Sequence, residues 1–140
     1  MVSGEEHNLA KPSVLLADDD AAFLAGVRKL LEPEFRIVDC VGDGQALIAA
    51  AHALVPDIIL TDISMPYLSG IQAVRRLKAT QPRARVIFLT VHEELAFAVQ
   101  AERCGALAYV LKRRAASDLI PAIRAVIDGS SFICPVTLEE

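Results

Sequence analysis

Residues 56–70 read PDIILTDISMPYLSG, and the architecture expected for the rest of the chain follows from this stretch. The run Ile58-Ile59-Leu60 is apolar, begins just after a proline and is too short for a helix, so it predicts a strand buried on both faces. Asp62 stands where this strand ends, because Met65-Pro66 does not allow it to continue. Open α/β sheets bind their ligands at the carboxyl ends of such strands. For Asp62 taken alone, a turn or a helix cap is the competing interpretation.

The 140-residue chain has the size and composition of one globular domain, with 54% hydrophobic and 23% charged residues. Its net charge of -4 and the lack of any basic run longer than Lys112-Arg113-Arg114 argue against nucleic-acid binding by this chain alone. No apolar stretch is long enough to span a bilayer, and Met1 to Pro12 has no signal-peptide core. The three cysteines are too widely spaced for a metal or disulfide framework. We therefore expect a cytoplasmic protein without membrane association.

The apolar pattern of the whole chain alternates between strands and helices. Five apolar runs predict strands, at residues 14–17, 35–41, 58–60, 86–90 and 108–111. Helical spacing predicts five helices, at residues 23–31 with Asp20 as N-cap, 46–54, 71–77, 93–103, and 119–127 with Ser117 or Asp118 as N-cap. This alternation predicts a single α/β domain with a doubly wound, five-stranded parallel sheet. Charged residues in the second strand, Arg36 and Asp39, place that strand at an edge.

Polar residues follow four of the predicted strands, and in a parallel sheet all these strand ends lie at one edge. They are Asp18-Asp19, Asp62, Thr90 and Lys112. Neighbouring carboxylates repel one another unless a cation intervenes, and Mg2+ suits oxygen ligands beside a phosphate. Lys112 offers a charge and Thr90 a hydroxyl to phosphoryl oxygens. Asp62 is then expected to be a nucleophile that forms an acyl phosphate. Each residue alone also fits a cap, a strand end or a solvated lysine, and it is their joint occurrence that favours a site.

These motifs resemble the receiver domain of bacterial two-component response regulators over roughly residues 13–128. They occur in the family's order: an apolar strand into Asp18-Asp19, Asp62 to Pro66 with Gly70, Val86 to Thr90, and Tyr109 to Lys112. The resemblance implies a flavodoxin-like (CheY-like) fold with strand order 2-1-3-4-5. It also implies a signalling domain and not an enzyme.

The resemblance assigns a role to each residue of the expected site. Asp62 accepts a phosphoryl group from a sensor histidine kinase. Mg2+ is held by Asp19 and Asp62 directly, by Asp18 largely through water, and by the backbone carbonyl of Ser64. Thr90 moves to the phosphoryl group and Tyr109 turns inward in response, while Lys112 pairs with the phosphate. The surface from Glu93 to Ile127 is then the output face.

The residues that follow Thr90 and Lys112 are the places where the chain differs from the family pattern or bears on it. Val91 stands where a small residue is usual, and its branched side chain is expected to narrow the access to Asp62. His92 lies at a position that tunes dephosphorylation, although a surface histidine is the simpler interpretation. Arg113-Arg114 replaces the commoner acidic residue or proline after Lys112.

The last part of the chain resembles receiver-first transcription factors with a C-terminal helix-turn-helix (LuxR/NarL-like). The expected organisation is a disordered leader at 1–12, a receiver domain at 13–128, and a linker or tail at 129–140, with the effector domain absent from this chain. DNA contact is expected only through that missing domain, and dimerisation through the fourth and fifth helices. A stand-alone receiver is the alternative.

Three other functions compete with a phosphoacceptor. In a haloacid-dehalogenase-like phosphatase, Asp18 and Asp20 would be nucleophile and acid, but Asp62 would have no role. A flavodoxin-like electron carrier needs a phosphate loop where this chain has Asp18-Asp19-Asp20, whose charges would repel a phosphate. A docking module that is never phosphorylated would not need the full set of acidic residues.

Overall fold

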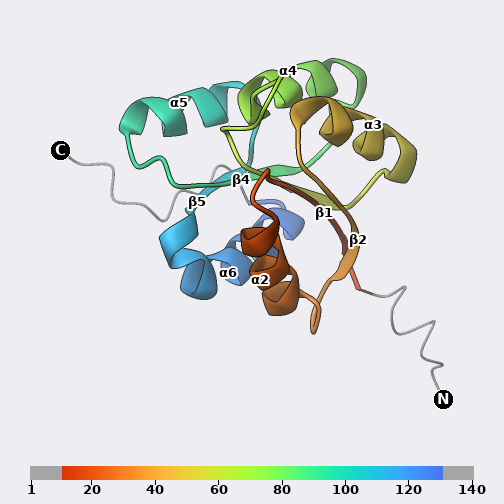
Figure 1. Cartoon of the computed structure of the whole chain (residues 1–140), viewed down its shortest axis with the longest axis vertical. Coiled ribbons are helices and arrows are strands. Elements are labelled where there is room, and N and C mark those ends of the chain that lie inside the picture. Colours follow the sequence, from red (N-terminus) through yellow and green to blue (C-terminus); the bar gives the residue numbers. More distant parts are fainter. Residues whose placement is uncertain (1–10, 131–140) are drawn as a thin grey trace.

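The computed structural model describes residues 11–130 as a parallel sheet between two layers of helices (Figure 1). The strands are β1 (Ser13–Ala17), β2 (Arg36–Val41), β3 (Ile58–Thr61), β4 (Val86–Thr90) and β5 (Ala108–Leu111). The helices are α2 (Ala21–Leu31), α3 (Gly44–Leu54), α4 (Gly70–Thr80), α5 (Leu95–Arg103), the 3-10 turn η1 (Lys112–Arg114) and α6 (Ala115–Ile127). All strand pairs are parallel and the order is β2-β1-β3-β4-β5, which confirms the predicted fold.

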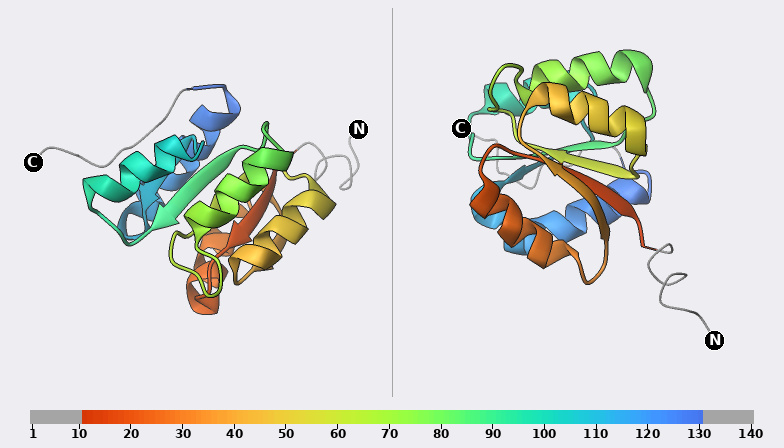
Figure 2. Two further views of the ribbon diagram at one scale, coloured as in Figure 1. Left: turned by 90° about the horizontal axis from the view of Figure 1, so that it is seen from above. Right: turned by 45° about the vertical axis from the view of Figure 1, so that its right-hand side comes forward.

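The sheet is apolar on both faces, as the strand sequences predict. Because successive side chains of a strand point to opposite faces, alternate strand residues enter two separate core layers. Leu15, Ile59 and Phe88 pack with α3, α4 and α5, whereas Leu16, Leu60 and Ile87 pack with α2 and α6. The right-hand view of Figure 2 shows α3 and α4 above the sheet and α2 and α6 below it.

Hydrogen-bonded caps begin the helices that follow the first three strands. The predicted cap at Asp20 is confirmed, since its side chain accepts the Phe23 N–H. The Asp43 side chain caps α3 in the same way. Ser69 and Gln72 form a reciprocal capping box at the start of α4. These caps turn the chain sharply at the carboxyl edge of the sheet, which leaves the connecting loops around the strand ends.

Several helix starts differ from the sequence-based prediction, among them that of α3, which begins at Gly44 instead of position 46. The last helix is not capped by Ser117 or Asp118, because it begins at Ala115 and continues directly from the 3-10 turn. The Ala115 N–H bonds to the Lys112 carbonyl, so the turn already supplies the first helical hydrogen bond. The fourth predicted helix begins at Leu95 instead of position 93. Glu93 is instead paired with Arg113, at 2.8 Å.

Two further predictions concern the sheet edge and the ends of the chain. The strand β2 lies at an edge of the sheet and is half-exposed, as expected from its charges. Within residues 11–130, no helix combines the length and apolarity needed to cross a membrane. Most of the predicted leader and tail falls in 1–10 and 131–140, outside the described residues.

Candidate functional site

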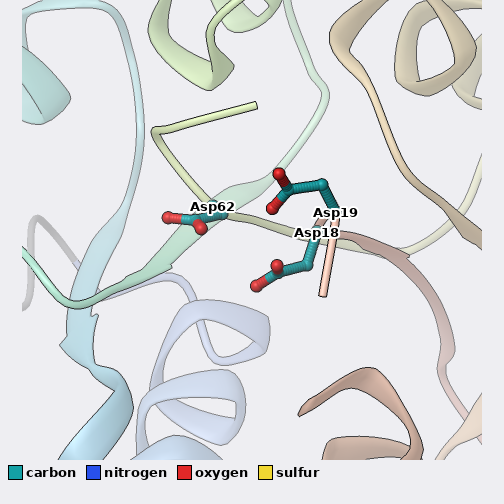
Figure 3. A group of neighbouring side chains, drawn as sticks. All are labelled: Asp18, Asp19 and Asp62. Atoms are coloured by element: carbon teal, nitrogen blue, oxygen red, sulfur yellow. The ribbon is translucent and has the colours of Figure 1, made fainter. Parts of the chain in front are cut away.

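Three aspartates meet at the carboxyl edge of the sheet. Asp18 and Asp19 follow β1, and Asp62 follows β3, its hydrogen-bonded neighbour. One carboxylate oxygen from each lies within 4.8 Å of the others, and Figure 3 shows the three side chains gathered there. Asp18 and Asp62 are buried, whereas Asp19 is exposed. The sequence predicted this convergence, because parallel neighbouring strands end at the same edge.

One lysine, at the end of the edge strand β5, reaches the three carboxylates. Lys112, the first residue after β5, places Nζ 2.7 Å from Asp18 Oδ2 and 3.1 Å from Asp62 Oδ2. Its side chain is only 14% exposed, so it is not the solvated lysine of the simpler interpretation. The ammonium also lies 4.5 Å from the ring centroid of Phe23, a contact that the sequence-based prediction missed.

The surroundings of Asp18 and Lys112 raise the pKa of both groups, for different reasons. Burial raises the pKa of the Asp18 carboxyl above its ordinary value, although the hydrogen bond from Lys112 works against this. Burial alone would lower the pKa of Lys112, but hydrogen bonds to Asp18 and Asp62 leave it above its ordinary value. Burial is thus the main cause at Asp18, and the two carboxylate partners are the cause at Lys112. The group has an excess of negative charge that a further cation would offset.

The loop between β3 and α4 holds the Asp62 carboxylate by its own backbone. The Ile63 N–H donates to Asp62 Oδ1 at 2.7 Å, and the Gly70 N–H donates to the Ile63 carbonyl at 2.7 Å. The loop returns so closely to the strand that a Cβ at Gly70 would overlap the Asp62 carbonyl oxygen. Position 70 therefore accepts only glycine in this backbone arrangement.

Thr90 and Tyr109 lie on the other side of Asp62, in β4 and β5. The Thr90 side chain is buried, and its Oγ1 accepts the His92 N–H at 3.2 Å. The Tyr109 ring is 1% exposed, and its hydroxyl donates to the His92 carbonyl at 2.6 Å. The ring predicted to turn inward in response to phosphorylation is thus already inside. Both residues are joined through the backbone of His92.

His92 also links two loops at the surface of the site. Its Nε2 lies 2.8 Å from the Ser64 hydroxyl, and its ring stacks on Phe97 with centroids 4.2 Å apart. His92 is therefore more than a surface histidine, a distinction that depends on contacts between separate loops and left no local signal in the sequence. Val91, expected to narrow the approach to Asp62, is 64% exposed.

A polar groove of about 790 Å3 opens beside Asp19. Its walls come from the β3–α4 loop, the first turns of α4, and α5, and they include Ser64, Arg75 and Gln100. Asp19 lines this groove, and its carboxylate groups with those of Asp18 and Asp62, oxygen donors of the kind that hard divalent cations prefer. The geometry thus combines a buried carboxylate, a cluster of oxygen donors, a lysine ammonium and an open approach.

Comparison with known proteins gives a family for this arrangement. A family model described as "Response regulator receiver domain" matches residues 14–124. The transcriptional regulatory protein DegU of Brevibacillus brevis is 34% identical over 133 residues, which cover 94% of this chain. This chain spans 56% of the length of that relative.

Solved structures agree with the sequence comparison. A LuxR-family two-component response regulator from Aurantimonas sp. SI85-9A1 superposes with a TM-score of 0.85 at 29% identity, covering 91% of each chain. The non-phosphorylated receiver domain of the stress response regulator RcsB from Escherichia coli has a TM-score of 0.82 at 31% identity. That match covers 89% of this chain and 98% of the RcsB domain.

Proposed function

The chain belongs to the response regulator receiver domain family, and from this premise we propose that Asp62 is its phosphoacceptor. The observation that supports this assignment is the contact of Asp62 Oδ2 with Lys112 Nζ at 3.1 Å, beside two further carboxylates. A carboxylate is a weak nucleophile toward a phosphorylated donor, because like charges repel. An ammonium and a divalent cation at the same place reduce that repulsion.

The proposed donor is the phosphohistidine of a sensor histidine kinase. A carboxylate oxygen of Asp62 forms a bond to phosphorus while the bond from phosphorus to the donor nitrogen breaks, and the electron pair leaves with the imidazole. Lys112 is placed to offset the charge on a phosphoryl oxygen, and the Ile63 N–H holds the Asp62 carboxylate in position. The chain thus takes up a phosphoryl group itself and is not proposed to be an enzyme that turns over free substrates.

The same residues fit a magnesium ion. Asp18, Asp19 and Asp62 would hold it, together with the backbone carbonyl of Ser64. When bound, Mg2+ supplies positive charge to the phosphoryl oxygens during transfer. Three carboxylates gathered around one ammonium leave an excess of negative charge, which supports this assignment.

A phosphoryl group on Asp62 would change the hydrogen bonds of Thr90 and Tyr109. It replaces the single charge of the carboxylate by about two charges on the phosphoryl group and adds strong acceptor oxygens. We propose that the Thr90 hydroxyl moves to such an oxygen and releases the His92 N–H. Since Tyr109 bonds to the His92 carbonyl, the change reaches β5 and then the surface of α5, β5 and α6.

The output that we propose is regulation of transcription by a protein of which residues 13–128 are the receiver domain. DegU, a transcriptional regulatory protein, supports this proposal, as does the fact that this chain spans 56% of its length. DNA binding would reside in a domain outside this sequence, and dimerisation would use α5 and α6. The proposed location is the cytoplasm, where histidine kinases present their phosphohistidine.

The phosphatase alternative is weakened by the position of Asp20. A haloacid-dehalogenase-like enzyme would use this residue as its acid, but its side chain is engaged as the N-cap of α2. Its carboxylate therefore has a structural partner, and Asp62 and Lys112 would have no catalytic task in that enzyme.

Intact-mass spectrometry after incubation with acetyl phosphate and Mg2+ tests the proposed function. We expect one phosphoryl adduct that hydroxylamine removes, that requires Mg2+ and that is absent in Asp62→Asn. Asp43→Asn is the matched control, because it changes the same charge while asparagine still caps α3. A folded protein without an adduct, tested with both acetyl phosphate and phosphorylated kinase, would overturn the proposal.

A further inference from the structure

We propose that Phe23 is a positioning residue for Lys112, holding its ammonium between Asp18 and Asp62 through the face of the aromatic ring. The proposal rests on the proposed phosphoacceptor function, since it concerns the lysine that would face the phosphoryl group. Phe23 lies in the first turn of α2, on the side of the sheet opposite to α4 and α5. The ammonium is 4.5 Å from its ring centroid, within the range of a cation–π contact.

Lys112 needs such a contact because it reaches the site on a flexible stem. Its ammonium carries three N–H bonds, and Asp18 and Asp62 accept two of them at 2.7 and 3.1 Å. The Lys112 side chain is largely buried, so few water molecules can solvate the rest of its ammonium. The negative electrostatic potential at the face of an aromatic ring stabilises a cation in such a position. The Phe23 ring supplies that face without offering another carboxylate, which would add to the excess of negative charge.

A series of contacts that begins and ends at Asp18 fixes the position of the Phe23 ring. Asp18 Oδ1 accepts the Asp20 N–H at 2.9 Å, and Asp20 Oδ1 accepts the Phe23 N–H at 3.0 Å. The Phe23 ring then contacts the Lys112 ammonium, which returns to Asp18 Oδ2. The helix cap and the lysine are thereby coupled, so the backbone position of Phe23 is set by the same carboxylate that Lys112 must meet.

Substitutions of Phe23 distinguish a role in positioning Lys112 from a role in packing alone. If Phe23 only fills space between α2 and the sheet, leucine should serve nearly as well as tyrosine. If the ring face positions Lys112, tyrosine should serve and leucine should not. The test therefore compares Phe23→Leu with Phe23→Tyr in the whole chain, and uses Leu30→Ala, a half-buried position on the same helix, as a control for lost stability.

The first readout is the rate of phosphorylation by acetyl phosphate at saturating Mg2+. We expect Phe23→Leu to be about five-fold slower, the size of an ordinary cation–π contribution. Phe23→Tyr and Leu30→Ala should stay close to the unsubstituted chain. A rate for Phe23→Leu equal to that of the unsubstituted chain, or a Phe23→Tyr as slow as Phe23→Leu, would overturn the proposal.

The second readout is independent of phosphorylation. In the unsubstituted chain the Cε protons of Lys112 should show an upfield ring-current shift by NMR, assigned by its loss in Lys112→Met. The shift should persist in Phe23→Tyr and disappear in Phe23→Leu, and its absence from the unsubstituted chain would overturn the proposal. If the unsubstituted chain forms no adduct with acetyl phosphate or with a phosphorylated kinase, the proposed function fails, and the chemical shifts alone decide whether Phe23 positions Lys112.

Discussion

The two sides of Asp62 are built from different interactions. At the ends of β1 and β5, Asp18 and Lys112 form a charged contact of 2.7 Å between side chains that are 3% and 14% exposed. Toward the loops, Ser64 Oγ and His92 Nε2 form a hydrogen bond of 2.8 Å near the surface. Removing one partner of a buried ion pair is far more costly than breaking an exposed hydrogen bond. The charged side is therefore suited to hold the reacting group, and the loop side is suited to rearrange.

The largest effect is expected from removing the cation on the charged side. Lys112→Met keeps much of the apolar stem but leaves the carboxylates without their ammonium, and phosphorylation by acetyl phosphate should slow by about 100-fold. Rates from quenched time courses measure this effect. Arg113→Met removes the neighbouring charge, which is exposed and paired with Glu93, and should leave the rate unchanged. Equal rates for Lys112→Met and the unsubstituted chain would contradict the importance given to this side.

The second-largest effect is expected when Mg2+ is added to the charged side of Asp62. Mg2+ that binds only the folded chain should stabilise it by about 2.7 kcal/mol when its concentration is about 100 times its Kd. Thermal unfolding with Mg2+ and with a chelator measures the increase. Asp19→Asn should reduce the increase because it removes one oxygen charge from the cluster, whereas Asp43→Asn should retain it. An increase that is identical in Asp19→Asn would place the ion elsewhere.

The third effect concerns the loop side. His92→Ala removes the hydrogen bond with Ser64 and the stacking on Phe97, and should lower the free energy of unfolding by about 1 kcal/mol in urea titrations. A double-mutant cycle with Ser64→Ala isolates the hydrogen bond.

The chain contains a matched control for this cycle. His52 and Thr80 form a similar exposed pair, with Nε2 2.8 Å from the hydroxyl, between α3 and the end of α4. Breaking that pair should cost a similar free energy without changing the rate at which the phosphorylated chain loses its phosphoryl group. His92→Ala should change that rate. Equal dephosphorylation rates in both variants would remove the distinction between the two sides.

The smallest effect is expected for Tyr109→Phe. The substitution removes the hydroxyl that donates to the His92 carbonyl but keeps the buried ring. Phosphorylation should therefore stay within about two-fold, while amide hydrogen exchange at residues 91–94 should become faster. Unchanged exchange there, or a large loss of phosphorylation, would show that the hydroxyl acts on the charged side instead.

The sheet and the meeting of its acidic residues were predictable from the sequence because they depend on strand direction alone. Apolar runs located the strands, and parallel order then required Asp18, Asp62, Thr90 and Lys112 to approach one edge. The start of α6 was not predictable in the same way. Ser117 and Asp118 are good capping residues, but a 3-10 turn continues into the helix and makes a cap unnecessary.

The contacts that refine the site depend on relations that no local pattern contains. Phe23 has the spacing of an ordinary core residue, and its contact with Lys112 joins α2 to the end of β5, two elements far apart in the sequence. His92 meets Ser64 because two loops approach each other. Residue type and spacing predicted which groups gather at the site, but not which neighbours support them.

The close return of the chain at Gly70 has a consequence for genetic screens. Any side chain there would displace the Asp62 carbonyl, and with it the strand end that presents the proposed phosphoacceptor. A screen for signalling-defective missense alleles should therefore recover position 70 as readily as position 62, although glycine contributes no chemical group. The two classes would separate in suppressor tests, because a change that lengthens the loop could rescue Gly70→Ala and could not restore a missing carboxylate.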